Sequence, residues 1–336
     1  MVNHREIKKT LIHVFQKKTL TKDEFNDLCI SIFKFQYQNN NIYQSYVNHV
    51  CKDVTNIHHY SQIPFLPIEF FKKHDVVCLP QSNSDVVFTS SGTTGSITSK
   101  HIVQDIELYS ESYRNGFQLF YGPINDYCIL ALLPSYLERS GSSVIYMFND
   151  LIKESNHPLS AFYLHNIDEL ISTTKKLAGS NQKVLLLGVT YALLDLAEKN
   201  HKLAKDWIVI ETGGMKGKRK EMIKHELHEI LINSFGVNSI HSEYGMTELL
   251  SQAYSKKNGI YHCVPWMKVL IRDINDPFTY LNNHKTGGIN VIDLANLYSC
   301  SFIETKDLGK INEDGDFEIM GRFDNSDLRG CNLMIN

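Results

Sequence analysis

The sequence lacks the features that mark secreted, membrane-spanning and disulfide-stabilised proteins. Its N-terminus has no apolar signal segment, and its longest apolar runs, residues 128–133 and 184–194, are too short or too interrupted to span a bilayer. The seven cysteines form an odd set without a Cys-x-x-Cys pair, so we expect reduced thiols. These absences together predict a cytoplasmic protein.

An excess of one charge sign is also missing. The formal net charge is -3, which gives no electrostatic case for a nucleic-acid partner or an anionic membrane surface. With 43% hydrophobic and 21% charged residues, the composition is that of a globular protein with a sizeable core.

Three common catalytic signatures are absent as well. There is no Gly-Lys-Ser/Thr of a Walker A loop, and no Gly-x-Ser-x-Gly elbow, which argues against an α/β-hydrolase. His225 and His228 are one residue too close together for the zinc-binding helix of a metalloprotease.

Helical spacing of apolar residues dominates the first part of the chain, over residues 6–17, 22–35 and 42–51. We interpret residues 1–75 as a helical N-terminal annex. It either packs on the core or lines a substrate tunnel.

Strand and helix patterns then alternate from residue 83 to about residue 245. We predict strands over residues 86–89, 127–132, 159–162, 183–187, 207–211 and 239–242. The spacing predicts helices over residues 105–120, 142–153, 166–177, 190–200 and 218–235. This alternation predicts an α/β fold with a mainly parallel sheet flanked by helices, whose ligands bind beyond the carboxyl ends of the strands.

Short strand patterns replace the helical period after residue 258, over residues 259–264, 267–272, 288–293, 301–304 and 316–320. Turn signals such as Asp314-Gly315 separate them. We therefore expect an α/β nucleotide-binding core at residues 76–257 and a small β-rich subdomain at residues 258–336.

A loop rich in hydroxyls and glycines follows the predicted strand at residues 86–89. Its glycines let the backbone turn with positive φ and bring N–H groups close to a ligand, and Lys100 adds a cation. Such a loop suits a polyphosphate, although a polar hairpin loop has the same composition. The candidate phosphate-binding residues are Ser90, Ser91, Gly92, Thr93, Thr94 and Gly95.

Two further polar stretches follow predicted strands. Gly213 and Gly214 expose backbone to a flat ligand such as a purine. Tyr244 can stack on a base, Thr247 can donate to a phosphate, and Glu248 can hold Mg²⁺.

A third stretch, residues 305–309, is expected to be a turn. An Asp in a turn can accept hydrogen bonds from both hydroxyls of a ribose, which makes Asp307 a candidate. Surface turns use Asp-Leu-Gly often, so this motif alone is weak.

In order and spacing, these motifs resemble those of the adenylate-forming superfamily. That superfamily includes acyl-CoA synthetases, adenylation domains of peptide synthetases and firefly-type luciferases. Residues 90–100 match its phosphate loop, and residues 244–248 match its Tyr-Gly-x-Thr-Glu motif. The resemblance implies Mg²⁺ on Glu248, Lys100 as a catalytic cation, and ATP bound by the phosphate loop and by Gly213, Gly214, Tyr244, Gly245, Thr247, Asp307 and Arg322.

Within that superfamily, the chain resembles most the acyl-protein synthetase family, also called long-chain-fatty-acid–luciferin-component ligases. The stretches that carry this resemblance are residues 33–43, 134–139, 211–214 and 329–333. The resemblance implies that a carboxylic acid, typically a fatty acid, is converted to an acyl-adenylate. The acyl group then moves to a C-terminal cysteine, matched here by Cys331, and on to a partner such as a fatty-acid reductase. The C-terminal lid domain and catalytic lysine of typical superfamily members are not expected, because the sequence ends at Asn336.

Two alternatives stay open. The first is an acyl- or aryl-CoA ligase with a minimal C-terminus, and the second is a nucleotide- or acyl-binding subunit with little catalysis. The basic run at residues 216–220 either replaces the lid lysine or forms a solvated helix start.

Overall fold

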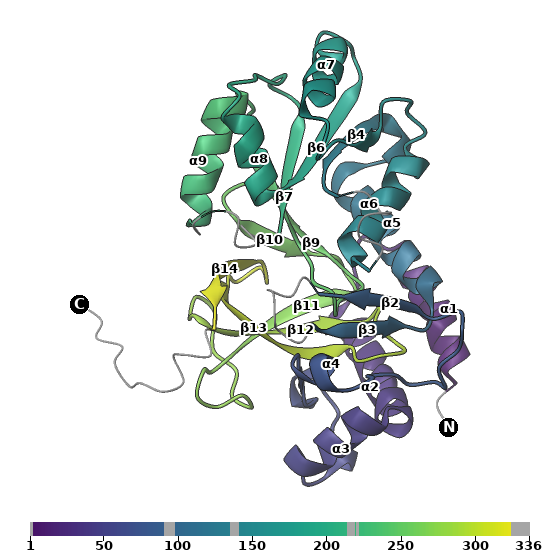
Figure 1. The fold of residues 1–336 in the computed structure, drawn as a ribbon. Coiled ribbons are helices and arrows are strands. Elements are labelled where there is room, and N and C mark those ends of the chain that lie inside the picture. Colours follow the sequence, from purple (N-terminus) through teal and green to yellow (C-terminus); the bar gives the residue numbers. More distant parts are fainter. Residues whose placement is uncertain (1–2, 91–97, 135–140, 214–218, 220–221, 324–336) are drawn as a thin grey trace, which may run out of the picture.

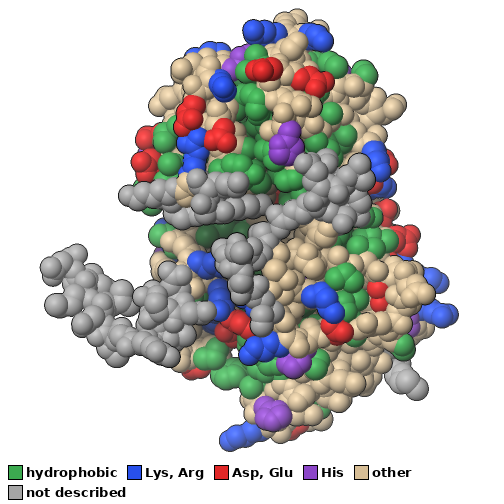
Figure 2. Space-filling model, viewed as in Figure 1, with side chains coloured by type: hydrophobic (Ala, Val, Ile, Leu, Met, Phe, Trp, Pro, Cys, Tyr) green, Lys and Arg blue, Asp and Glu red, His purple; other side chains and the backbone are tan. Residues whose placement is uncertain are grey.

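The computed structural model describes residues 3–90, 98–134, 141–213, 219 and 222–323. A twelve-stranded mixed sheet runs through the molecule in the order β11-β12-β13-β14-β10-β9-β8-β7-β6-β4-β5, with β1 paired to β13 (Figure 1). Helices cover both faces of its upper half, which confirms the predicted fold class. Lysine, arginine, aspartate and glutamate side chains are interspersed over the face seen in Figure 2.

The parallel half of the sheet carries most of the predicted alternation. Its strands are β4 (Tyr127–Leu132), β5 (Ala161–Phe162), β6 (Lys183–Val189), β7 (Ile208–Thr212) and β8 (Ile240–Tyr244). Its helices are α5 (Ile106–Tyr121), α6 (Ser143–Glu154), α7 (Ile167–Leu177), α8 (Thr190–Ala197) and α9 (Lys224–Phe235). Every residue of β4 is buried, because parallel strands have both faces covered by helices.

The antiparallel half continues the same sheet. It contains β9 (Ala253–Ser255), β10 (Ile260–Cys263), β11 (Met267–Arg272), β12 (Gly287–Asp293), β13 (Phe302–Ile311), β14 (Phe317–Arg322) and the short β1 (Leu66–Pro67). Strand β9 joins the halves by pairing with β8 on one side and β10 on the other. The sheet thus crosses the expected boundary at residue 257, and the three-part division remains a prediction.

The N-terminal helices are α1 (His4–Val14), α2 (Lys22–Asn39), α3 (Asn41–Val50) and α4 (Phe70–Lys73), with 3-10 turns at Val54–Asn56 and Tyr60–Gln62. Another 3-10 turn, Ile124–Asp126, lies between α5 and β4. A capping box of Thr21 and Glu24 starts α2, as its sequence favours. Buried Gln36 on α2 donates to the carbonyls of Asn296 and Leu297 at 3.0 Å. These helices therefore pack on the core of the antiparallel half. In the described part of the chain, no helix is long and apolar enough to cross a membrane.

The polar loop after residue 89 does not follow a strand of the parallel sheet, so that prediction is wrong. Strands β2 (Val86–Thr89) and β3 (Lys100–Val103) pair only with each other, as an antiparallel hairpin. Phe88 is fully buried against Tyr109 and Tyr146, which seats the hairpin on α5 and α6.

Two other expectations also need correction. Asp307 lies inside the long strand β13, because β12 and β14 pair with β13 on either side of it, and the expected turn does not form. Helix α9 begins at Lys224, six residues later than predicted. A start at residue 218 would place a basic run in the first turn, where the helix dipole disfavours positive charge. Arg219 instead pairs with Asp195 of α8 and with Glu198, the residue directly after α8.

Candidate active site

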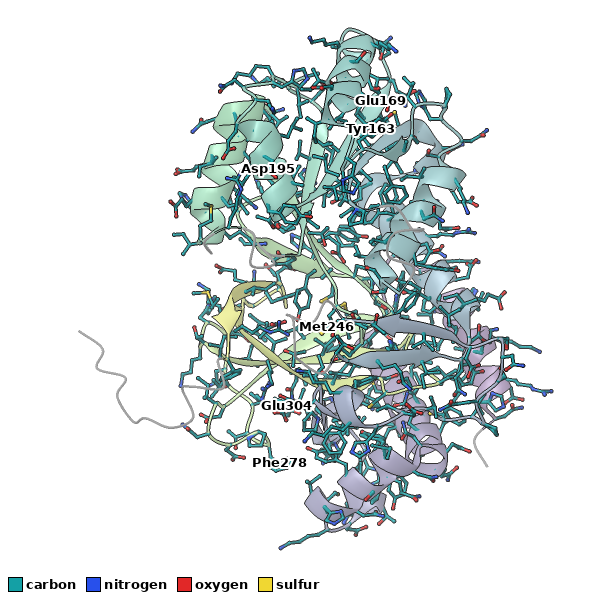
Figure 3. All side chains as sticks on the ribbon, viewed as in Figure 1. Tyr163, Glu169, Asp195, Met246, Phe278 and Glu304 are labelled. Atoms are coloured by element: carbon teal, nitrogen blue, oxygen red, sulfur yellow. The ribbon has the colours of Figure 1, made fainter. Side chains whose placement is uncertain are left out.

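The segment after β8 lies where the two halves of the sheet meet. Met246, labelled in Figure 3, lies between the parallel half and the β2–β3 hairpin. A cavity of about 160 Å³ opens beside it, and its lining residues include Thr89, Ser143, Gly213, Glu243, Gly245 and Thr247. Three residues predicted from two separate motifs, Gly213 from one and Gly245 and Thr247 from the other, are therefore brought to one cavity.

Glycine is required at two points of this lining. A Cβ atom on Gly245 would clash with Oε1 of Glu243, so only bare backbone fits there. Gly213 has φ of 66°, in the left-handed region that favours glycine.

Tyr244, Asp307 and Arg322 form one polar contact. The Tyr244 hydroxyl donates to Asp307 Oδ2 at 2.9 Å, and Arg322 Nε lies 3.4 Å from Asp307 Oδ1. Burial raises the pKa of Asp307, while the charge of Arg322 and the hydrogen bond from Tyr244 oppose this rise. The structure thus joins three candidates that lie far apart in the sequence.

The ring of Tyr244 is itself part of the core. It is 6% exposed and packs edge-on against Tyr261 and Phe317. Stacking of this ring on a base remains a prediction.

His101 ties the hairpin to the segment after β8. Its Nδ1 lies 2.8 Å from the carbonyl oxygen of Thr247, and its Nε2 lies 3.1 Å from Asn296 Oδ1. Burial lowers the pKa of His101 to about 4, so the ring is neutral at physiological pH. Asn296 also donates to the carbonyl of Glu248 at 2.7 Å, which fixes the backbone of both Thr247 and Glu248.

Glu248 is 4% exposed, and burial raises the pKa of its carboxyl, while a hydrogen bond from Ser99 opposes the rise. Buried Asp293 orders the following residues by accepting from the backbone N–H groups of Leu250 and Ser251 at 2.6 and 3.0 Å. Within the described residues, no group of three or more His, Cys, Asp or Glu side chains is placed to hold a metal ion.

Lys100 and Ser90 lie at the loop end of the β2–β3 hairpin. Lys100 Nζ forms an ion pair with Asp75 Oδ1 at 2.7 Å, and both side chains are almost half exposed. Ser90 Oγ accepts from the backbone N–H of Ser99 at 2.9 Å, which closes the neck of the loop. The remaining candidates lie outside the described residues: Ser91, Gly92, Thr93, Thr94, Gly95, Gly214 and Cys331.

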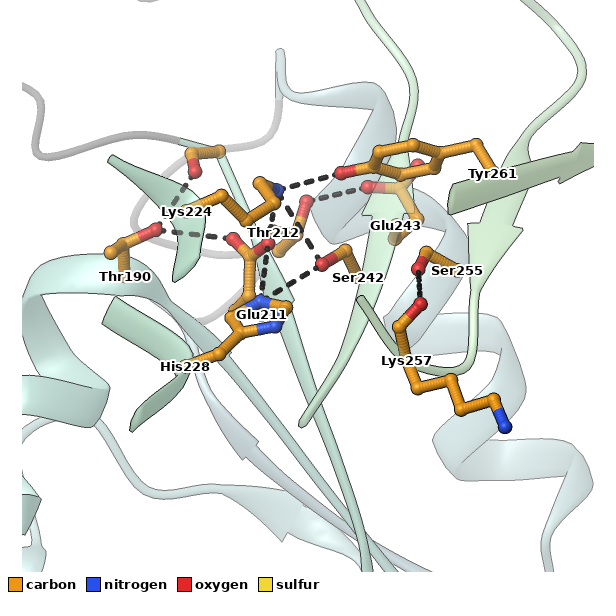
Figure 4. Close-up of polar contacts among 11 residues, drawn as sticks. Thr190, Glu211, Thr212, Lys224, His228, Ser242, Glu243, Ser255, Lys257 and Tyr261 are labelled. Atoms are coloured by element: carbon orange, nitrogen blue, oxygen red, sulfur yellow. Dashed lines mark hydrogen bonds and ion pairs between the residues drawn. The ribbon is translucent and has the colours of Figure 1, made fainter. Parts of the chain in front are cut away.

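A buried polar network stabilises the end of β7, directly before Gly213 (Figure 4). Glu211 pairs with Lys224, which also contacts the Tyr261 hydroxyl at 2.6 Å. Burial opposes the charge of Glu211, but Lys224, His228 and Ser242 outweigh it and lower the pKa of this carboxyl to about 2. Thr190 Oγ1 donates to the Gly213 carbonyl at 2.9 Å, next to its contact with Glu211.

A second buried glutamate, Glu243, has its pKa shifted in the opposite direction. Burial and the charge of Glu211 raise the pKa of Glu243 to about 7, against a hydrogen bond from Thr212 Oγ1 to its Oε2 at 2.5 Å. The pKa values of two carboxyl groups on neighbouring strands are therefore shifted in opposite directions.

Several of these residues were missed by motif reasoning. Glu243 directly precedes Tyr244, and His101 directly follows Lys100, so adjacency to a motif was the available signal. Lys224 and Asp293 carried no such signal, because neither adjoins a motif and their partners lie on other elements of the fold.

Solved structures share this fold. ATP-bound MatB from Rhodopseudomonas palustris has a TM-score of 0.54 at 16% identity, covering 73% of this chain and 50% of that chain. O-succinylbenzoate coenzyme A synthetase from Bacillus subtilis, in complex with ATP and a magnesium ion, has a TM-score of 0.51 at 17% identity, covering 70% and 49%. An open conformation of 2-hydroxyisobutyryl-CoA ligase, in complex with 2-HIB-AMP and CoA, has a TM-score of 0.69 at 11% identity, covering 90% and 70%. This chain spans about half the length of the first two proteins, and no curated protein matches it.

The fold is that of the adenylate-forming ligases. The profile of the family described as "Acyl-protein synthetase, LuxE" matches residues 15–336. The chain belongs to this acyl-protein synthetase family.

Proposed function

We propose that this protein is an ATP-dependent acid–thiol ligase that activates a carboxylic acid as an acyl-adenylate. The observation that carries the proposal is the convergence of Gly213, Gly245 and Thr247 on one cavity. Membership of the acyl-protein synthetase family supports it.

The residues around the cavity suit ATP. Gly213 and Gly245 line the cavity and would face the base with their backbone. Asp307, held by Tyr244 and Arg322, would offer its carboxylate to the ribose hydroxyls. Thr247 would donate to a phosphate. The ion pair of Lys100 with Asp75 is exposed and worth at most about 1 kcal/mol, so Lys100 can turn to a phosphate at small cost.

The first step requires a carboxylate to attack the α-phosphate of ATP, one anion against another. Two unit charges about 4 Å apart repel by about 4 kcal/mol at an effective dielectric of about 20. Donors from the hairpin loop, Thr247 and Lys100 would offset this repulsion and hold the attack in line. Mg²⁺, held by Glu248 and the phosphates of ATP, would neutralise part of the phosphate charge. A magnesium ion bound mainly by phosphates and water needs few ligands from the protein.

In the second step a thiol attacks the acyl carbonyl, a C–S bond forms and AMP leaves. We assign this thiol to Cys331, from which the acyl group passes to a partner protein such as a reductase. A free thiol has a pKa of about 8.5, so its proton must be removed for attack at neutral pH. A long-chain fatty acid is the acid that the family resemblance favours.

Pyrophosphate exchange with ATP across a panel of carboxylic acids tests the first step. Exchange that depends on one acid is expected, and ATP binding without exchange under any acid would favour a non-catalytic subunit. For the second step, the protein is incubated with ATP, Mg²⁺ and the labelled acid in the absence of coenzyme A. Label should stay on the protein through a hydroxylamine-sensitive bond and disappear in Cys331→Ser.

The CoA-ligase alternative makes the opposite prediction. Coenzyme A would then strongly increase AMP formation, and Cys331→Ser would be tolerated. Label retained on the Cys331→Ser protein would exclude the cysteine assignment.

A further inference from the structure

A groove separate from the active-site cavity lies beside the antiparallel half of the sheet. It has a volume of about 430 Å³ and is lined from α3, from the segment after α3, from the connection between β11 and β12, and from β13. Among the described residues, none lines both the groove and the active-site cavity. The apolar part of its lining includes Tyr46, Val50, Ile63, Phe65, Phe278 and Tyr280.

Part of this apolar lining is open to solvent. Phe65 and Tyr280 pack edge-on against each other with their ring centroids 6.3 Å apart. Phe278 is 56% exposed, although it is a large aromatic side chain. It is labelled in Figure 3, as is Glu304, the acidic residue of the lining. An exposed aromatic residue at the edge of an apolar groove is typical of a surface that binds another segment of polypeptide.

The last described residue, Phe323, lies next to this groove. Its backbone N–H donates to the carbonyl of Lys306 at 2.8 Å, and its ring centroid is 5.6 Å from the guanidinium carbon of Arg272. Arg272 in turn lies 3.4 Å from Glu304, which lines the groove. Residues 324–336, here called the C-terminal segment, therefore start beside the groove.

The C-terminal segment cannot simply continue β14 along β13. Strand β12 pairs with β13 at Glu304 on one edge, so β1, which also pairs there, occupies the edge that β14 follows. Ile68, directly after β1, already donates to the Glu304 carbonyl at 2.9 Å. Phe323 is opposite Lys306, two residues from Glu304, so the side chains of Phe323 and Glu304 lie on the same face of the sheet. The chain thus has to leave the sheet next to the groove.

The sequence of the C-terminal segment is complementary to the groove. Residues 333–335 are Leu-Met-Ile, which suits an apolar lining, and Arg329 is its single basic residue. Burial raises the pKa of Glu304, while the charge of Arg272 opposes this rise, and a second cation would further stabilise the carboxylate. At about 3.3–3.6 Å per residue, residue 331 can lie up to about 26–29 Å from Phe323, which is enough to run along the groove.

We propose that the C-terminal segment binds in this groove, with residues 333–335 against Phe278 and with Arg329 near Glu304. Bound there, Cys331 lies outside the active-site cavity, so the segment has to leave the groove before the thiol can attack an acyl-adenylate. The role of Cys331 in this inference rests on the proposed function. The binding of the segment does not depend on it.

Two native cysteines provide the test. Cys51 lines the groove and is partly exposed, and Cys331 belongs to the C-terminal segment. The dilute protein is treated with bismaleimidoethane, a short reagent that links two thiols, and its peptides are identified by mass spectrometry. We expect a Cys51–Cys331 link in protein of monomer mass. Cys263 is partly exposed on β10 and does not line the groove, so it is the internal reference and should not link to Cys331.

A pair of substitutions in one connection identifies the groove as the cause. Phe278→Ser should lower the rate of linking at least about tenfold, because it removes the apolar surface of an aromatic side chain. Ile274→Ser is the matched control, since Ile274 is 49% exposed between the same two strands and lies outside the lining. Pyrophosphate exchange should stay at the wild-type rate in both variants. Acyl labelling of Cys331 should be faster in Phe278→Ser, where the segment is released more often.

The outcomes separate this inference from the proposed function. The absence of a Cys51–Cys331 link, while each thiol reacts with N-ethylmaleimide, would overturn the inference. A link found only in protein of doubled mass would overturn it as well, because the groove would then bind a second copy. Equal linking rates in Phe278→Ser and Ile274→Ser, or slower labelling of Cys331 in Phe278→Ser, would also contradict it. A link in a protein that shows no exchange with any acid would refute the proposed function and leave the binding of the segment standing.

Discussion

Removing the charge of Lys224 should destabilise the fold far more than removing the charge of an exposed lysine. Glu211 has a side chain that is 3% exposed, and its pKa is about 2 against an ordinary 4.5, despite burial, because of Lys224, His228 and Ser242. In Lys224→Met the carboxylate stays buried without its charged partner. A return of the pKa to 4.5 would by itself cost about 3 kcal/mol at neutral pH, at the lower end of the roughly 3–5 kcal/mol measured for broken buried pairs.

The pH dependence follows from the sign of this shift. Because the folded pKa of Glu211 lies below its unfolded value, its contribution is present above about pH 4.5 and is lost as the pH falls through 2. The difference between wild type and Lys224→Met should therefore be largest at neutral pH and shrink towards acid pH.

Urea unfolding followed by circular dichroism measures the effect at pH 7. Lys183→Met is the matched control, because Lys183 pairs with Asp126 at 2.8 Å while the two side chains are 59% and 39% exposed. Exposed pairs contribute about 0–1 kcal/mol. The double variant Glu211→Gln/Lys224→Met should recover most of the lost stability, since no uncompensated charge remains. Equal losses below about 1 kcal/mol in the two lysine variants would refute the reasoning.

Three further predictions concern the candidate active site. In pyrophosphate exchange, Asp307→Asn should raise the KM for ATP by about 10- to 100-fold, which corresponds to the loss of a hydrogen bond to a charged group. An unchanged KM would exclude binding of the ribose by Asp307. Glu243→Gln should raise the free energy of unfolding by about 3 kcal/mol at pH 8 and by much less at pH 5. The reason is that the raised pKa of Glu243 makes the stability of the wild type fall as the pH rises from 4.5 through 7. Urea unfolding curves that show the same stability difference at both pH values would contradict this prediction. Gly245→Ala should lower kcat/KM at least about tenfold, because its Cβ meets Glu243 Oε1, and wild-type kinetics would show that this close approach is not needed.

Much of the parallel half could be predicted from local pattern. Strands β2 and β4 and helix α7 begin and end within one residue of the predicted bounds, because each has a clear apolar period and a polar or glycine-containing boundary. The Tyr-Gly-x-Thr-Glu stretch was also identifiable, since a glycine between polar groups at a strand end suits a ligand. These signals lie within a few residues of one another, so no tertiary information was needed.

The predictions that were wrong concern segments whose conformation depends on the strands or side chains with which they pair. The β2–β3 hairpin has the same residue pattern as a parallel strand, and only its pairing with itself excludes it from the sheet. Asp307 has the sequence of a turn, yet β12 and β14 hold it within a strand. The start of α9 depends on the partners of Arg219 on another helix.

By itself, the sequence determined the class of fold, the order of its motifs and the family to which the chain belongs, because those depend on local period and on residue identity. The tertiary structure alone decided the state of the two buried carboxyl groups. Glu211 and Glu243 are the same residue type one strand apart, and they differ because Lys224 faces the first and a neutral hydroxyl faces the second. A charge partner from α9, the next helix along the chain, lowers the pKa of Glu211, whereas burial raises the pKa of Glu243, which has no such ion pair among the described residues.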